Sequence, residues 1–164
     1  MGLRFKQPLA VFLSILFVIP GCLGDDSNGT PLDDFSFSAD DGKEYSKENM
    51  KGSEYLIHFS ASWCSRCYKS MHNISDAIGE TGYLVMSMEK EDLNGLSDWH
   101  EAANDSNSTQ DIAAPFMDGS ELSEALGVKA MPTIILVDRN GNIIDTHEGD
   151  LIAHDDILKF LEQA

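Results

Sequence analysis

The chain has 164 residues, of which 28 are acidic and 11 are basic, so its formal net charge is −17. This acid excess disfavours nucleic-acid binding, because contacts to phosphates need clustered lysine and arginine. The length suits a single domain.

The N-terminus has the features of an export signal. Arg4 and Lys6 give it a positive start, and residues 9–19 form an apolar run of 11 residues. Such a run fits the apolar part of a signal peptide but is short for a membrane span, which needs about 20 residues. We therefore predict that residues 1–21 are a signal peptide and that the protein is extracytoplasmic.

The apolar run ends at Pro20-Gly21-Cys22, which resembles the lipobox of prokaryotic lipoproteins. The resemblance implies cleavage before Cys22 and attachment of lipid to Cys22, which would anchor the protein to the cell membrane. The alternative is an ordinary signal peptide followed by an unrelated cysteine. Cleavage there leaves 143 residues, with 9 basic and 28 acidic side chains. Polar residues 22–32 are then expected to form a flexible, lipid-anchored tether, and residues 33–164 the folded domain.

The first half of this domain predicts a parallel strand–helix–strand unit. Residues 33–45 suggest a short hairpin, and residues 47–51 suggest a helical turn. Residues 55–60 are rich in strand-forming side chains. Apolar residues then recur at helical spacing from Cys67 to about Gly79, and residues 83–88 predict the next buried strand. A strand, a helix and a strand in this order favour parallel pairing.

The second half is less regular until its C-terminal hairpin. We expect a helix at 96–103, a short strand at 113–117 and a helix at 120–126. Strands are predicted at 133–137 and 142–148, joined by a turn that contains Asn140-Gly141. Asp155 and Asp156 are expected to open the last helix, because acidic side chains suit a helix N-terminus.

Two cysteines separated by two residues, Cys64 and Cys67, follow the first predicted buried strand and open a helix. If Cys22 carries lipid, these two form a self-contained pair, and export places them where disulfides persist. A helix N-terminus stabilises a thiolate. We therefore expect Cys64 to be an exposed nucleophile of low pKa and Cys67 a more buried resolving thiol. Arg66 would add positive potential, and Trp63 would shield the site and contact partners.

Two segments carry a resemblance to the thioredoxin superfamily. Residues 59–67 look like its active-site segment, and residues 127–133 look like its cis-proline segment. The resemblance implies that Pro132 is the cis residue, and that Met131 and Thr133 adjoin the substrate groove. It also implies an α/β thioredoxin-like fold over residues 33–164, with a central mixed β-sheet flanked by helices.

The long stretch before Pro132 is similar to the TlpA and ResA type of membrane-anchored thiol-disulfide oxidoreductase, which has an extra helix and strand there. The expected partners are thiols and disulfides of exported proteins, together with a membrane-bound or soluble redox partner. No cofactor is implied. The spacing alone leaves the direction of electron flow open.

One position departs from the family. Thioredoxins commonly have a buried aspartate six residues before the first cysteine, and here His58 occupies that place. His58 is either a proton-transfer group near neutral pH or a packed strand residue. Two other functions stay open. One is metal or copper delivery, for which His58 and His72 lie near the two cysteines in sequence. The other is peroxide reduction. The latter lacks its Pro-x-x-x-Thr-x-x-Cys signature, since Ala61 stands in the threonine place.

Overall fold

The computed structural model describes residues 29–78, 82–106 and 110–163. The predicted signal peptide, the lipid-attachment residue Cys22 and residues 22–28 of the predicted tether lie outside these ranges.

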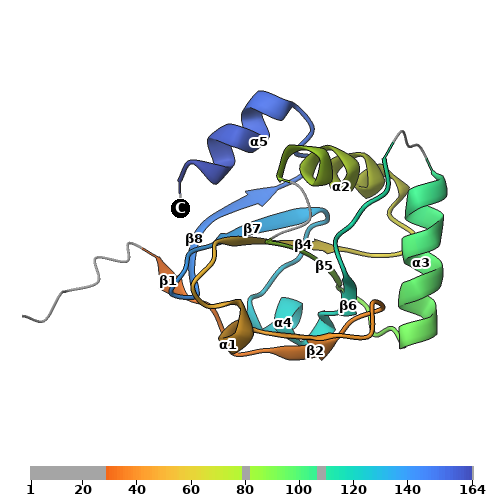
Figure 1. The fold of residues 1–164 in the computed structure, drawn as a ribbon, viewed down its shortest axis with the longest axis horizontal. Helices are drawn as coiled ribbons and strands as arrows, with labels where there is room; N and C mark the ends of the chain where they lie inside the picture. The colour runs from red at the N-terminus through yellow and green to blue at the C-terminus, as the bar shows by residue number, and fades with distance from the viewer. Residues whose placement is uncertain (1–28, 79–81, 107–109, 164) are drawn as a thin grey trace, which may run out of the picture.

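A six-stranded mixed sheet forms the centre of the domain (Figure 1). Strand β4 (Tyr55–Ser60) lies inside it, parallel to β5 (Tyr83–Ser87) on one side and antiparallel to β7 (Thr133–Val137) on the other. The connection from β4 to β5 runs through helix α2 (Ser65–Ile78), because parallel neighbours need a crossover. In spatial order the strands are β1 (Thr30–Pro31), β8 (Asn142–Glu148), β7 (Thr133–Val137), β4 (Tyr55–Ser60), β5 (Tyr83–Ser87) and β6 (Phe116–Asp118).

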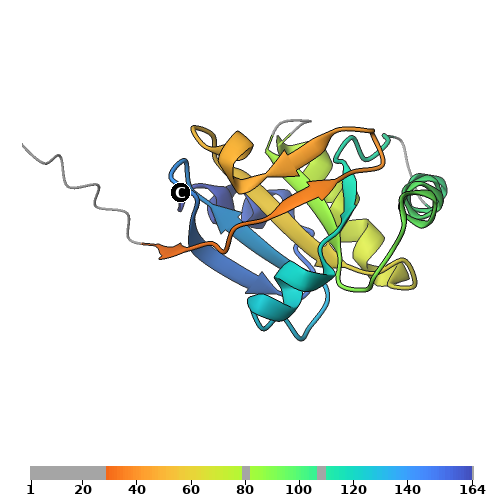
Figure 2. The ribbon, with the colours of Figure 1, turned by 90° about the horizontal axis from the view of Figure 1, so that it is seen from below.

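Helices and a small hairpin cover both faces of the sheet (Figures 1 and 2). Helices α2 (Ser65–Ile78) and α5 (His154–Leu161) lie on one face. The other face carries α4 (Ser120–Ala125), α1 (Lys47–Met50) and the hairpin of β2 (Ser36–Ser38) and β3 (Glu44–Ser46). Helix α3 (Leu93–Asp105) stands beside the β6 edge.

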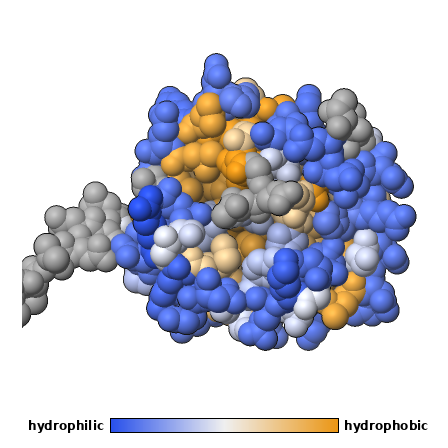
Figure 3. Space-filling model, viewed as in Figure 1, coloured by the Kyte–Doolittle hydropathy of each residue, from blue (hydrophilic) through white to orange (hydrophobic). Residues whose placement is uncertain are grey.

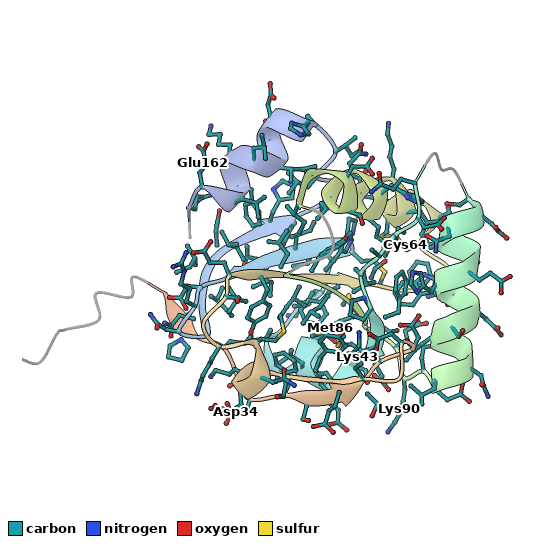
Figure 4. All side chains as sticks on the ribbon, in the orientation of Figure 1. Asp34, Lys43, Cys64, Met86, Lys90 and Glu162 are labelled. Atoms are coloured by element: carbon teal, nitrogen blue, oxygen red, sulfur yellow. A yellow bond between two sulfur atoms is a disulfide. The ribbon has the colours of Figure 1, made fainter. Side chains whose placement is uncertain are left out.

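The core therefore consists of two apolar clusters, one on each face. Side chains alternate along a strand, so Leu56 joins the cluster that holds both cysteines and Ile57 joins the other. Figure 4 shows Cys64 on the α2 side of the sheet and Met86 on the opposite side. Strand β4 is buried along its whole length, which explains why most of its residues are apolar on both faces of the sheet.

The hairpin of β2 and β3 is bonded to the α3 region through Asp40. One carboxylate oxygen of Asp40 accepts the backbone N–H of Phe116 at 2.8 Å, and the other lies 2.6 Å from Nδ1 of His100. The second imidazole nitrogen of His100 lies 2.6 Å from the carbonyl oxygen of Ile112. The imidazole also stacks on the ring of Phe116.

The predicted fold class is confirmed: the sheet is mixed, helices flank it, and α3 and β6 form the extra helix and strand before Pro132. Several boundaries differ from expectation, and three of these differences have a clear cause. Thr30–Pro31 pairs with β8 and Leu32 is buried, so the fold begins before residue 33. Helix α3 begins at Leu93, because the Asp92 carboxylate accepts the N–H of Gly95. Strand β6 begins only at Phe116, because Pro115 has no N–H for a ladder bond.

The face seen in Figure 3 is mostly hydrophilic, as the acid excess predicts, with a hydrophobic area around α5. Among the described residues, every helix is too short or too polar to cross a bilayer.

Candidate active site

Cys64 and Cys67 form a disulfide at the start of α2, with an S–S distance of 2.01 Å. Cys64 directly precedes the first residue of the helix, and its carbonyl accepts the N–H of Cys67 at 2.9 Å. Cys67 is fully buried, as expected. The expectation that Cys64 is exposed is wrong, because only 4% of it is accessible. It packs into the apolar cluster beneath α2 rather than standing clear of it.

This placement gives the pair its chemistry. A disulfide at a helix N-terminus opens to a dithiol when it takes up two electrons and two protons. The free N–H groups and the dipole of the helix then stabilise a thiolate on the first cysteine. The ring closed by residues 64–67 is too short to restrain much of the unfolded chain. The arrangement therefore suits reversible redox chemistry better than structural support.

Trp63 is the exposed member of the motif, with 63% of its surface accessible. Its indole N–H donates a 3.0 Å hydrogen bond to the Glu89 carboxylate, just after β5. The indole is thus held at the surface, next in sequence to the buried Cys64. Glu89 was not identified from the sequence.

The loop before β7 brings a second segment to the site. The peptide bond between Met131 and Pro132 is cis. Met131 is partly buried and packs against the cluster that contains Cys64 and Cys67. Thr133 is buried and its hydroxyl donates to the carbonyl of Ala130 at 2.8 Å. The fold therefore brings Met131 to the apolar cluster that holds the disulfide, across a separation of more than sixty residues in sequence.

Arg66 is paired rather than free. Its Nε lies 3.5 Å from a carboxylate oxygen of Asp150, a residue that follows β8. The predicted positive potential at the start of α2 is therefore partly neutralised by a carboxylate that the sequence pattern did not reveal.

His58 is fully buried in β4, on the face of the sheet that carries the disulfide. Its Nδ1 shares a 2.7 Å hydrogen bond with the hydroxyl of Tyr83, whereas its Nε2 has no partner among the described residues. Burial lowers the pKa of His58 to about 3. It is therefore neutral near pH 7, which favours the packed strand residue over a group that titrates at neutral pH.

The two histidines considered for metal binding have other partners. The ring nitrogens of His72 lie 3.2 Å from the Gln110 carbonyl oxygen and 3.1 Å from that of Ala103. Within residues 29–78, 82–106 and 110–163, no three histidine, cysteine, aspartate or glutamate side chains gather as a metal site would require.

Comparisons with known proteins agree with this geometry. The Redoxin family matches residues 27–161 of the chain. The chain is 29% identical over 119 residues to the thiol:disulfide interchange protein DsbE of Vibrio cholerae, covering 69% of this chain but only 59% of that protein. It is 25% identical to the thioredoxin-like protein YneN of Bacillus subtilis, covering 75% and 72% of the two chains. An exposed lipoprotein thioredoxin of Streptococcus pneumoniae superposes with a TM-score of 0.65 at 26% identity, covering 80% of this chain and all of that one.

Proposed function

The chain belongs to the Redoxin family, and on that premise we propose that it is a thiol-disulfide oxidoreductase acting on exported proteins from a lipid-anchored position outside a prokaryotic cytoplasm. The observation that carries the chemistry is the Cys64–Cys67 disulfide at the start of α2, packed in one cluster with Met131 beside a cis proline.

In the reducing direction, the thiolate of Cys64 attacks one sulfur of a substrate disulfide. The substrate S–S bond breaks, a mixed disulfide forms with Cys64, and one substrate sulfur leaves as a thiolate that takes up a proton. Cys67 then loses its proton and attacks the sulfur of Cys64. This closes the Cys64–Cys67 bond and releases the second substrate thiolate, so two electrons have passed to the substrate. Reversal of both steps inserts a disulfide.

A redox partner must reset the pair after each turnover. A reductase needs a dithiol donor and an oxidase needs a disulfide or other two-electron acceptor, either in the membrane or in solution. The reduction potential separates these directions. A value near about −270 mV indicates a reductant, and one near about −120 mV indicates an oxidant.

The proposed location is supported by the N-terminal sequence and by relatives. Residues 1–21 have the charge and apolar pattern of a signal peptide, and Cys22 follows them directly as the last residue of a lipobox-like segment. The pneumococcal neighbour is described as an exposed lipoprotein, and the Vibrio relative as a thiol:disulfide interchange protein. For this chain, both the anchor and the exported substrates are part of the proposal.

Insulin reduction by dithiothreitol tests the enzymatic function. The purified protein should accelerate the reaction, Cys64→Ser should abolish the acceleration, and Cys67→Ser should accumulate a mixed disulfide that mass spectrometry detects. Equal rates with the parent and Cys64→Ser proteins would refute the proposed chemistry.

Membrane fractionation tests the anchor separately. Cys22→Ser should move the protein from the membrane fraction to the soluble extracytoplasmic fraction, because it removes the site of lipid attachment. Retention of this variant in the membrane would instead indicate an uncleaved signal anchor. Neither result depends on the activity of the disulfide.

A further inference from the structure

The short segment 149–151, which follows β8, connects two parts of the site. The backbone N–H of Gly149 donates a 2.8 Å hydrogen bond to the carbonyl of Pro132. Two residues later, the N–H of Leu151 donates a 3.0 Å hydrogen bond to the buried hydroxyl oxygen of Ser70 in α2. Leu151 is buried in the same apolar cluster as the two cysteines. The segment is therefore fixed at both ends, to the cis-proline loop and to the helix that carries the disulfide.

Asp150 is the residue between these two anchors, and its carboxylate pairs with Arg66. Arg66 has 63% of its side chain exposed and Asp150 has 34%. Isolated pairs at such exposure contribute little to stability, partly because both side chains must lose rotamer freedom. Here the backbone on each side of Asp150 is already held by hydrogen bonds, so pairing has only the rotamers of its short side chain left to fix at that residue. It remains beside the first turn of α2.

We propose that Asp150 is a positioning residue that acts through Arg66 to keep the Cys64 thiol less acidic than the helix and the arginine alone would make it. A cation near a thiolate favours its ionisation, and a helix N-terminus acts in the same direction. Arg66 follows Cys64 by two residues, in the first turn of α2. Asp150 offsets that cation, so the charge acting on Cys64 depends on a residue after β8.

The inference rests on the dithiol chemistry proposed above, and it predicts the direction in which the acidity of the Cys64 thiol changes when Asp150 is replaced. Asp150→Asn removes the counter-charge and keeps the shape of the side chain. The ionisation constant of the reduced Cys64 thiol should then increase by roughly two- to fivefold, the range that exposed ion pairs support. A more stable thiolate favours the dithiol, so the equilibrium with a reference dithiol should move the same way. A threefold change corresponds to about 14 mV.

The experiment measures the alkylation rate of Cys64 by iodoacetamide in the reduced full-length protein as a function of pH, with mass spectrometry to identify the modified cysteine. The matched control is Glu162→Gln, which removes one acidic charge from an exposed residue that Figure 4 shows far from Cys64. Other ionisable groups near the motif, namely Lys69, Glu89 and His58, are the same in every protein compared. Circular dichroism confirms that each variant is folded.

Asp150→Asn should shift the titration toward lower pH, whereas Glu162→Gln should leave it unchanged. In an Arg66→Gln background the effect of Asp150→Asn should largely disappear. Equal titrations for the two single variants would overturn the inference. So would a full-sized effect of Asp150→Asn without Arg66, because Asp150 would then act on Cys64 directly. Thiol acidity is measurable whether or not the protein reduces insulin, so this test and that of the proposed function can fail independently.

Discussion

Lowering the pH from 7 to 4.5 should reduce the free energy of unfolding by about 2–3 kcal/mol through His58 alone. Burial in β4 lowers the pKa of His58 to about 3, whereas a histidine in the unfolded chain has its ordinary value of 6.5. Between these values the unfolded state binds a proton that the folded state does not. Stability contributed by the neutral imidazole is therefore complete above pH 6.5 and is lost progressively as the pH falls toward 3.

The magnitude follows from the two pKa values. A pH of 4.5 lies two units below the unfolded pKa of 6.5. At this pH the histidine is almost fully protonated in the unfolded chain and almost fully neutral in the folded protein. Each unit corresponds to about 1.36 kcal/mol, which gives about 2.7 kcal/mol. This loss adds to that from other groups, so it has to be measured as a difference between proteins.

Urea unfolding at both pH values measures that difference in the parent and in the double variant His58→Leu, Tyr83→Phe. The double variant removes the titrating ring together with its hydrogen-bond partner, so no buried hydroxyl loses its partner at this position. Tyr83→Phe alone is the matched control, because it keeps the buried histidine. The parent and Tyr83→Phe should each lose about 2–3 kcal/mol more on acidification than the double variant.

If acidification reduced the free energy of unfolding equally in all three proteins, the reasoning would be refuted. They would mean that His58 binds its proton equally well in the folded and unfolded states. A smaller acid loss in Tyr83→Phe than in the parent would show that removing the hydroxyl admits the protonated ring.

His100 should give the opposite pH dependence: burial opposes its charge, but its carboxylate and carbonyl partners outweigh burial and raise its pKa. The stability contributed by protonated His100 is complete below about pH 6.5 and is lost as the pH rises through the raised pKa. His100→Gln should therefore reduce the decrease in Tm that the parent protein shows as the pH rises above 6.5, and an equal decrease in both proteins would contradict this. Gly119→Ala should destabilise by about 1–3 kcal/mol, because its Cβ would lie 2.6 Å from the Cβ of Met86. Gly95→Ala in α3 meets the flexible Glu91 carboxylate at the same 2.6 Å and should be neutral or stabilising by up to about 1 kcal/mol; equal losses by chemical denaturation would contradict the distinction.

Much of the sheet was predictable because its strands have local signals. The bounds of β4, β7 and β8 agree with the sequence-based expectation, since β4 and β7 are rich in strand-forming residues and Gly141 occupies a positive-φ turn just before β8. The start of α3 was missed because its first turn has an exposed leucine and a glycine and is set by a capping carboxylate. An apolar period does not detect such a turn.

The candidate site was likewise predictable only in part. The cysteine pair and Pro132 were visible because each belongs to a compact motif. Asp150, Glu89 and Tyr83 were not, because each contacts a partner more than twenty residues away in sequence, and only the folded chain brings the two together. Asp150 follows Arg66 by more than eighty residues, and a single acidic residue in a strongly acidic chain carries no distinctive signal.

The burial of Cys64 beside an exposed Trp63 bears on which reductants can open the disulfide. Exchange requires a thiolate to reach a sulfur, so its rate depends on access as well as on driving force. A small thiol in the surroundings finds little of that sulfur in contact with solvent. A protein that first docks on the indole can displace the covering side chains and expose it. We therefore expect the oxidised protein to exchange more slowly with a small thiol than with a protein partner that fits this surface.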